Sequence, residues 1–156
     1  RDKSAEQQTR DWEAVKAAER AGRAQTGVLA DVARNLPALM RAEKLQKRAA
    51  RIGFDWPDIG DVLDKMTEEA RELAEARETL PQEKIAEEMG DLLFVMANLA
   101  RHLKVDPEVA LRGANAKFVR RFGFIEDALR AQGRRCEESD LAEMDALWDR
   151  AKARGL

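Results

Sequence analysis

The sequence predicts an all-α protein built as an antiparallel helical bundle, and three observations lead to this prediction. Hydrophobic residues make up 44% of the 156-residue chain, charged residues 37% and aromatic residues only 5%, a mixture typical of long amphipathic helices. Apolar residues recur at helical spacing, and no segment shows the alternation of a strand. Prolines and glycines punctuate these segments, and the short connections favour antiparallel neighbours.

The N-terminal stretch, residues 5–24, is expected to form a polar helix that is weakened near its end by Gly22 and Gly27. Its thin apolar stripe consists of Trp12, Val15 and Ala18. We interpret residues 1–35 as a linker or arm and residues 36–156 as the helical domain. Because the chain begins at Arg1 rather than Met, we expect it to be part of a longer protein.

Three helices are predicted to follow, and each is opened by a proline. The first begins at Pro37 and stops at Gly53, the second covers residues 57–80 and the third residues 81–105. The third helix carries apolar residues spaced alternately four and three apart, which is typical of a bundle interface. These seam residues are Ile85, Met89, Leu92, Met96, Leu99 and Leu103.

Two further helices are predicted in the C-terminal third. Asp106 is expected to cap a helix that starts at Pro107, reaches about Gln132 and ends at Gly133. Its inward side chains are expected to be Val109, Leu111, Ala114, Phe118, Phe122, Ile125 and Leu129. Ser139 is expected to cap a last short helix that contains Leu141, Met144, Leu147 and Trp148.

Composition argues against several classes of protein. The formal net charge of -2 gives no overall attraction for nucleic acid, so binding through Arg120, Arg121, Arg130, Arg134 and Arg135 is not favoured. The single cysteine, Cys136, is interpreted as an incidental thiol, and it indicates a reducing, cytoplasmic compartment. We find no signal peptide and no apolar run near the ~20 residues that a membrane span needs.

Two acidic motifs are the most informative feature of the chain. They read Glu68-Glu69-Ala70-Arg71-Glu72 and Glu87-Glu88-Met89-Gly90-Asp91. Each places carboxylates three or four residues apart, and therefore on one helix face beside the apolar stripe. A hairpin hinged at Pro81 would bring the acids of the two motifs level with one another. Converging carboxylates repel unless a cation lies between them, and Mg²⁺ prefers carboxylate oxygens and often pairs them with substrate phosphates.

We therefore predict a Mg²⁺ site, with Mn²⁺ as a substitute, held by Glu69, Glu72, Glu88 and Asp91. For one such motif alone, solvated acids paired with Lys or Arg would be the default interpretation. A di-iron carboxylate bundle needs Glu-x-x-His on two helices, but Leu99 stands three residues before the single histidine, His102. We expect His102 to be a packed or surface residue.

A basic stretch downstream provides a candidate phosphate site. Lys117 and Arg121 are four residues apart on one helix face, and the arginine fork suits phosphate oxygens. Facing the acids, they would bind a polyphosphate between the two groups. Trp148 could stack on the base of a nucleotide there, with the positive charge of Lys152 one turn later. The alternative is ordinary surface pairing of Lys117 and Arg121 with acids nearby, and a core position for Trp148.

Together these segments resemble the MazG family, the all-α nucleoside triphosphate pyrophosphohydrolases. The resemblance rests on the two acidic motifs and on the runs Gly90 to Phe94, Asn98 to Leu103 and Ala114 to Phe122. Residues 28–56 are similar to the segment that precedes the C-terminal catalytic domain in the two-domain form of that family. Only one acidic pair occurs in this chain.

The resemblance implies Mg²⁺-dependent hydrolysis of nucleoside triphosphates to monophosphate and pyrophosphate in a homodimer or higher homo-oligomer. Pockets of this kind often recognise the phosphates more than the base, so we expect a broad range of triphosphates that includes deoxy and non-standard ones. The resemblance also implies that the four acids named above hold the metal and that Glu68 orients or deprotonates the attacking water. It further implies that Lys117, Arg120 and Arg121 hold the phosphates and that Trp148 holds the nucleoside. Lys65 and the residues from Lys84 to Glu87 would line the same pocket. The alternative is a non-enzymatic helical module for oligomerisation or regulation.

Overall fold

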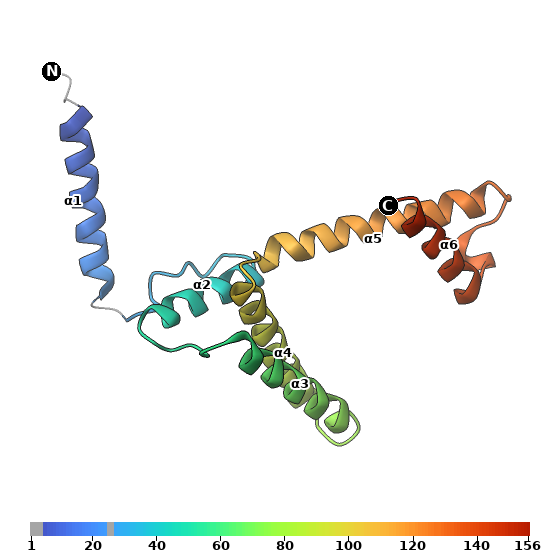
Figure 1. Ribbon diagram of the computed structural model, residues 1–156, viewed down its shortest axis with the longest axis horizontal. Helices are drawn as coiled ribbons and strands as arrows, with labels where there is room; N and C mark the ends of the chain where they lie inside the picture. The colour runs from blue at the N-terminus through green and yellow to red at the C-terminus, as the bar shows by residue number, and fades with distance from the viewer. Residues whose placement is uncertain (1–4, 25–26) are drawn as a thin grey trace. The chain divides into compact units, whose positions relative to one another are not determined.

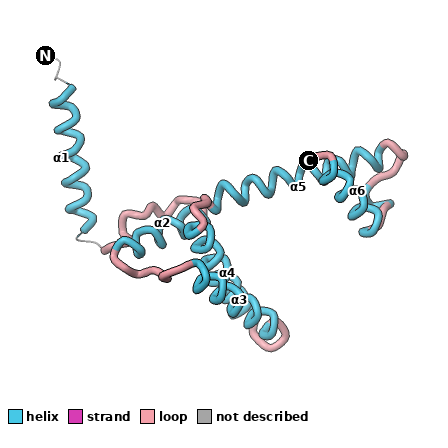
Figure 2. Tube along the Cα trace, viewed as in Figure 1, coloured by secondary structure: helices cyan, strands magenta, loops and turns pink. Residues whose placement is uncertain are grey.

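The computed structural model describes residues 5–24 and 27–156, and within these residues it contains helices and no strand (Figures 1 and 2). The prediction of an all-α fold is therefore confirmed. The helices are α1 (Ala5–Ala24), α2 (Ala38–Arg51), α3 (Ile59–Ala76), α4 (Gln82–His102), α5 (Pro107–Arg130), the 3-10 turn η1 (Cys136–Glu138) and α6 (Leu141–Ala153). Within the described part of the chain, no helix is both long and apolar enough to cross a membrane.

The chain divides into two compact units, residues 1–107 and residues 108–156, which we describe separately. This division falls at the start of α5. The predicted limits of a linker ending at residue 35 and a helical domain beginning at residue 36 stay a prediction.

In the first unit, α3 and α4 form an antiparallel hairpin, and α2 packs against α4 (Figure 1). Val62 of α3 and Ala97 of α4 lie in this core and are almost completely shielded from solvent. A side chain also ties α2 to α4, because Gln46 Nε2 donates to the carbonyl oxygen of Phe94 at 2.8 Å. The hairpin brings the two acidic motifs onto neighbouring helices, as the sequence predicted.

The helix ends follow local chemistry. Gly53 has a φ of +90° and Gly133 a φ of +68°, so both predicted stops use the left-handed conformation that glycine adopts without strain. Four predicted starts differ from the observed ones by one or two residues. α2 and α4 begin directly after Pro37 and Pro81, which are their N-cap residues. Asp58, not Pro57, caps α3 by accepting from Asp61 N at 3.2 Å, and Asp140, not Ser139, caps α6 by accepting from Glu143 N at 2.8 Å. In each case the carboxylate reaches the free N–H group three residues ahead, which an N-cap must satisfy.

The second unit has its core where α6 meets the C-terminal half of α5. Ile125, Leu129 and Leu147 are buried together, and the half-buried Cys136 packs against them. This agrees with the interpretation of Cys136 as an incidental thiol rather than a reactive one.

The apolar seam predicted on α4 and the inward face predicted on α5 are only partly buried. Met96 and Leu103 of α4 are about half exposed, and so are Leu111 and Phe118 of α5. The predicted interior of α5 is therefore wrong for Leu111 and Phe118, although Phe118 contacts Trp148 of α6. An apolar helix face this exposed is typical of a surface that packs against another protein.

Candidate metal and nucleotide site

Three glutamates from the two acidic motifs meet on the α3–α4 hairpin. One carboxylate oxygen from each of Glu69, Glu72 and Glu88 lies within 4.8 Å of the other two. We call these three residues the carboxylate group. Glu69 and Glu72 are one turn apart on α3, and the short turn before Pro81 places Glu88 of α4 opposite them. Glu69 and Glu88 are half-buried and Glu72 is exposed, so the group is open to solvent on one side.

The other predicted acids, Glu68 and Asp91, are outside the carboxylate group. Asp91, the fourth predicted metal ligand, is exposed on α4, three residues beyond Glu88, and is not part of the carboxylate group. Glu68, the predicted base, is also exposed and lies next to Glu69 on α3. The structure thus brings three of the four predicted ligands together.

Lys65 supplies a positive charge to the carboxylate group. Its Nζ lies 2.6 Å from Glu69 Oε1 and 3.9 Å from Glu68 Oε2, both on the same helix. The hydrogen bond to Glu69 raises the pKa of the Lys65 ammonium above its ordinary value, with the nearby charges of Glu68 and Glu72 acting in the same direction. In the same way Lys84 pairs with Glu87 at 2.6 Å on α4.

The donor set of the carboxylate group fits a hard divalent cation. Three carboxylate oxygens are ligands of the type that Mg²⁺ and Mn²⁺ prefer, and the exposed side leaves room for water or phosphate oxygens. Neighbouring ligands of one octahedral Mg²⁺ lie about 3 Å apart and opposite ligands about 4.2 Å apart, so the three oxygens, which lie within 4.8 Å of one another, must move closer to share one ion. Rotation of the glutamate side chains can bring them together.

The predicted phosphate and nucleoside residues lie in the second unit, where two of them contact each other. The guanidinium carbon of Arg121 lies 5.1 Å from the centroid of the Trp148 ring, and Arg121 Nε donates to the carbonyl oxygen of Leu156 at 2.8 Å. Phe118 also contacts Trp148, with ring centroids 5.5 Å apart. Lys117, Arg120 and Lys152 are exposed. That these residues face the carboxylate group stays a prediction.

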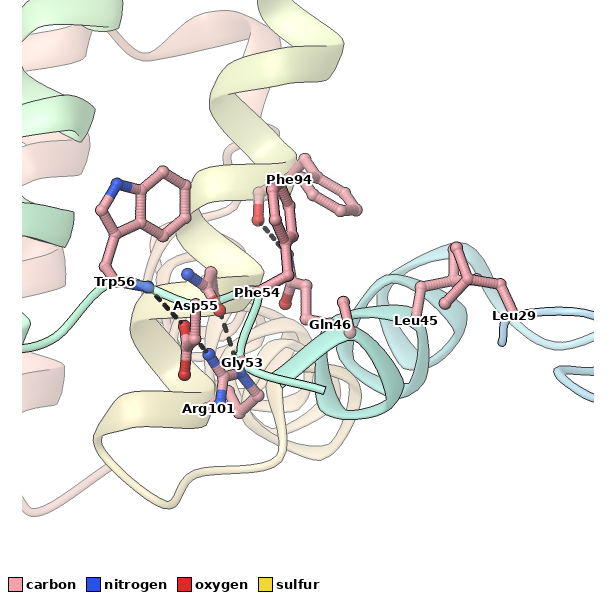
Figure 3. Close-up of a pocket in the computed structure, with 11 residues that line it drawn as sticks. Leu29, Leu45, Gln46, Gly53, Phe54, Asp55, Trp56, Phe94 and Arg101 are labelled. Atoms are coloured by element: carbon pink, nitrogen blue, oxygen red, sulfur yellow. Dashed lines mark hydrogen bonds and ion pairs between the residues drawn. The ribbon is translucent and has the colours of Figure 1, made fainter. Parts of the chain in front are cut away.

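A pocket of about 470 Å³ in the first unit was not predicted from the sequence (Figure 3). Aromatic side chains line it from both α4 and the loop between α2 and α3, namely Phe94, Phe54 and Trp56, and Leu29 and Leu45 add further apolar surface. The polar lining comes from Gln46, Asp55, Asn98 and Arg101. Gln46 Oε1 is buried without a hydrogen-bond partner among the described residues.

An ionic contact fixes the loop that forms one wall of this pocket. Asp55 Oδ1 accepts hydrogen bonds from the Arg101 guanidinium and from Trp56 N, the latter at 2.8 Å. The same oxygen lies 3.2 Å from His102 Nε2. Burial alone would raise the pKa of the Asp55 carboxyl, but the hydrogen bonds from Arg101 and His102 outweigh it and hold this pKa below its ordinary value. His102 is therefore a packed residue, as expected, and not a ligand of the carboxylate group.

The sequence held one signal for this pocket. Phe54-Asp55-Trp56 places two aromatic residues around a carboxylate in a loop between a glycine and a proline, and loops of this kind often carry functional side chains. Arg101, which binds Asp55, is 46 residues away in the chain, and helical periodicity does not predict contacts at this separation.

The described residues thus form an all-α protein with a candidate metal site on one helical hairpin. Residues 59–122 match the MazG nucleotide pyrophosphohydrolase domain, so this part of the chain is similar to that family. The matched range contains α3, α4 and the part of α5 up to Phe122, and hence both acidic motifs.

Named relatives support this similarity. The chain is 50% identical over 143 residues to the nucleoside triphosphate pyrophosphohydrolase of Escherichia coli (strain K12), covering 90% of this chain and 54% of that protein. It is 41% identical over 143 residues to the nucleoside triphosphate pyrophosphohydrolase/pyrophosphatase MazG of Thermotoga maritima, covering 92% of this chain and 54% of that one. The uncharacterized protein YabN of Bacillus subtilis (strain 168) is 41% identical, covering 91% of this chain and 29% of that protein. The chain thus spans about half the length of the first two relatives.

Proposed function

We propose that this chain hydrolyses nucleoside triphosphates to nucleoside monophosphate and pyrophosphate in a Mg²⁺-dependent reaction, with Mn²⁺ as a substitute metal. The observation that carries the proposal is the carboxylate group of Glu69, Glu72 and Glu88 within the part of the chain that matches the MazG domain. The names of the relatives from Escherichia coli and Thermotoga maritima support the reaction type.

The carboxylate group, together with Asp91, would hold the metal. When bound, Mg²⁺ would offset the charge of the triphosphate oxygens and lower the pKa of coordinated water. Glu68 is exposed beside Glu69 and is free of the carboxylate group, so it is the acid best placed to take the proton of the attacking water. Lys65 offers an ammonium that can turn from Glu69 to a phosphate oxygen.

The aromatic pocket is proposed to receive the nucleoside. Phe94 lies six residues beyond Glu88 on α4, so the two side chains leave the helix about 9 Å apart along its axis and about 120° apart around it. Phe54, Trp56 and Phe94 offer flat apolar surface, on which a base of any kind can stack, so a broad range of triphosphates is expected. Lys117, Arg120, Arg121 and Lys152 are proposed to bind the phosphates, and Trp148 is proposed as a further stacking surface for the nucleoside, from either the same or a second copy of the chain.

A homodimer is part of this proposal. α4 and α5 each carry half-exposed apolar side chains that a second copy could cover. The cytoplasm is the proposed compartment, on the basis of the single cysteine.

Substitution of one carboxylate tests the reaction directly. Glu72→Ala and Asp91→Ala should each abolish pyrophosphate release from a panel of common and damaged triphosphates, while helix content stays native by circular dichroism. The matched control is Glu75→Ala, which removes another exposed glutamate from α3 three residues beyond Glu72 and should retain activity. Full activity of Glu72→Ala would contradict the proposal.

A metal-binding measurement separates the enzyme from a purely structural module. If the acids act only in salt bridges between subunits, Mg²⁺ with nucleotide should not raise the melting temperature. The enzyme should instead show a Mg²⁺-dependent rise that grows when a non-hydrolysable nucleotide is added, because both ligands bind the folded state.

A further inference from the structure

A second hollow in the first unit lies on the other side of α2 from α4. It has a volume of about 420 Å³ and is formed by the segment 31–36 and one face of α2. Four of its eight lining residues are cations, namely Lys44, Lys47, Arg48 and Arg51. We call this feature the cationic hollow.

Helix geometry shows that the cationic hollow is separate from the site already described. Lys44, Lys47, Arg48 and Arg51 are spaced by three, one and three residues, so they share one face of α2. At about 100° per residue, Gln46 lies roughly 150° from the middle of this face, and Gln46 is the residue that binds α4 through Phe94. The cations therefore point away from α4 and from the aromatic pocket.

The positive charge of the hollow is only partly neutralised by the protein. Arg48 Nη2 lies 2.8 Å from Asp31 Oδ2, and Lys47 Nζ lies 2.7 Å from Glu43 Oε1. Across the described residues, Lys44 and Arg51 make no ion pair. Like charges four residues apart, such as Lys44 with Arg48 and Lys47 with Arg51, repel and destabilise a helix unless an anion lies between them.

The arrangement selects one chemical class of anion. The two paired cations are held in place by Asp31 and Glu43, whereas Lys44 and Arg51 stand about 10 Å apart along the axis with their long side chains free to converge. Ammonium and guanidinium groups in this number suit an anion with several phosphate oxygens. The uncharged lining is Val32, Ala33 and Leu36, so the hollow has no aromatic ring on which a base could stack.

We propose that the cationic hollow is a second anion site that binds a phosphoanhydride chain through its oxygens, either free pyrophosphate or the polyphosphate tail of a nucleotide. This site differs from the carboxylate group in needing no metal. It goes beyond the proposed hydrolysis and does not depend on it.

Calorimetric titration of the full chain with pyrophosphate, in metal-free buffer of low ionic strength, tests the proposal. Without metal the carboxylate group repels the ligand, so binding there does not contribute. We expect saturable binding that weakens at least about tenfold in the double variant Lys44→Ala/Arg51→Ala and that falls steeply with added salt. The matched control, Arg112→Ala/Arg130→Ala, removes two exposed arginines from α5 and should bind as the wild type does.

Further ligands and one background variant complete the experiment. Orthophosphate should bind more weakly than pyrophosphate, and tripolyphosphate should bind as tightly as ATP if the hollow recognises the phosphate chain alone. Binding should persist in Glu72→Ala, which separates this proposal from the proposed hydrolysis. Absence of pyrophosphate binding, equal loss in the control, or unchanged affinity in Lys44→Ala/Arg51→Ala with native circular dichroism would each overturn the proposal. Should the alanine variant unfold, Lys44→Gln/Arg51→Gln replaces it with the same expected loss.

Discussion

Lys65 Nζ lies 2.6 Å from Glu69 Oε1, so an ammonium already offsets part of the negative charge of the carboxylate group. The same glutamate is a proposed metal ligand. A cation entering the group must therefore displace this ion pair or share Glu69 with it, and the two positive charges repel. This relationship makes Lys65 a determinant of metal affinity as well as a candidate phosphate-binding residue.

Lys65→Gln should bind Mg²⁺ more tightly than the wild type in the absence of nucleotide. Removing a unit charge a few ångströms from the metal site at the protein surface is expected to strengthen binding by about tenfold. The KM for nucleoside triphosphate should rise in the same variant, because the ammonium is lost as a phosphate ligand. Calorimetry with Mg²⁺ and steady-state kinetics measure the two effects.

Lys84→Gln is the matched control for this prediction. Lys84 pairs with Glu87 at the same distance of 2.6 Å, but Glu87 is outside the carboxylate group. Its loss should change Mg²⁺ affinity much less. If both variants bind Mg²⁺ as weakly as the wild type, the ion pair of Lys65 does not compete with the metal.

Asp55→Asn should loosen the loop that carries Phe54 and Trp56. The carboxylate of Asp55 accepts hydrogen bonds from Arg101 and from Trp56 N. An asparagine amide has one acceptor oxygen and no negative charge, so it keeps at most part of these hydrogen bonds and loses the ion pair with Arg101. We expect the KM for nucleoside triphosphate to rise about tenfold with a smaller change in kcat, since the reacting groups are elsewhere, and stability to fall by about 1–2 kcal/mol.

Asp58→Asn provides the comparison for Asp55→Asn, because asparagine remains a good N-cap and Asp58 is in the same loop region. It should leave the KM unchanged. A fall in kcat with constant KM in Asp55→Asn would contradict the assignment of this aspartate as a positioning residue.

The stability of the second unit should depend on pH through Glu143. The hydrogen bonds from Arg134 and from Ser139 hold the pKa of the Glu143 carboxyl below its ordinary value near 4.5. A carboxyl with a lower pKa in the folded state than in the unfolded state stabilises the fold above the unfolded pKa. This stabilisation is lost as the pH falls from about 4.5 through the folded pKa.

Glu143→Gln isolates this contribution. The difference in unfolding free energy between wild type and Glu143→Gln should be constant near pH 7 and should shrink below about pH 4.5. Urea denaturation followed by circular dichroism at a series of pH values measures it. Asp145→Asn, which changes an exposed carboxylate on the same helix, is the matched control.

The local features of this fold were predictable because they depend on neighbours in the chain. The stops at Gly53 and Gly133 and the placing of the acids of α3 and α4 beside each other follow from glycine conformation, proline position and helical spacing. Burial was less predictable. Leu111 is apolar and lies at the same heptad spacing as Ile125, yet only Ile125 is buried, because Ile125 packs in the core that α5 forms with α6. Helical periodicity gives the apolar face of a helix but not what covers it.

The candidate site was likewise predictable only where it depends on local sequence. Glu69, Glu72 and Glu88 meet because a short turn joins two amphipathic helices. The contact of Asp55 with Arg101, and hence the wall of the aromatic pocket, depends on how α2 packs on α4, and no local pattern specifies that. The pairing of Arg121 with Trp148 likewise joins two residues that the sequence placed in separate roles.

Leu129→Ala should destabilise the second unit strongly. Leu129 is completely buried between Ile125 and Leu147, and its truncation leaves a cavity that the two helices can close only in part. The expected loss is about 2–5 kcal/mol in unfolding free energy. Leu141→Ala, which removes the same atoms from a side chain that is 78% exposed, should change it by less than about 0.5 kcal/mol. Chemical denaturation of both variants measures the difference, and similar stabilities would show that α5 and α6 do not pack around Leu129 in solution.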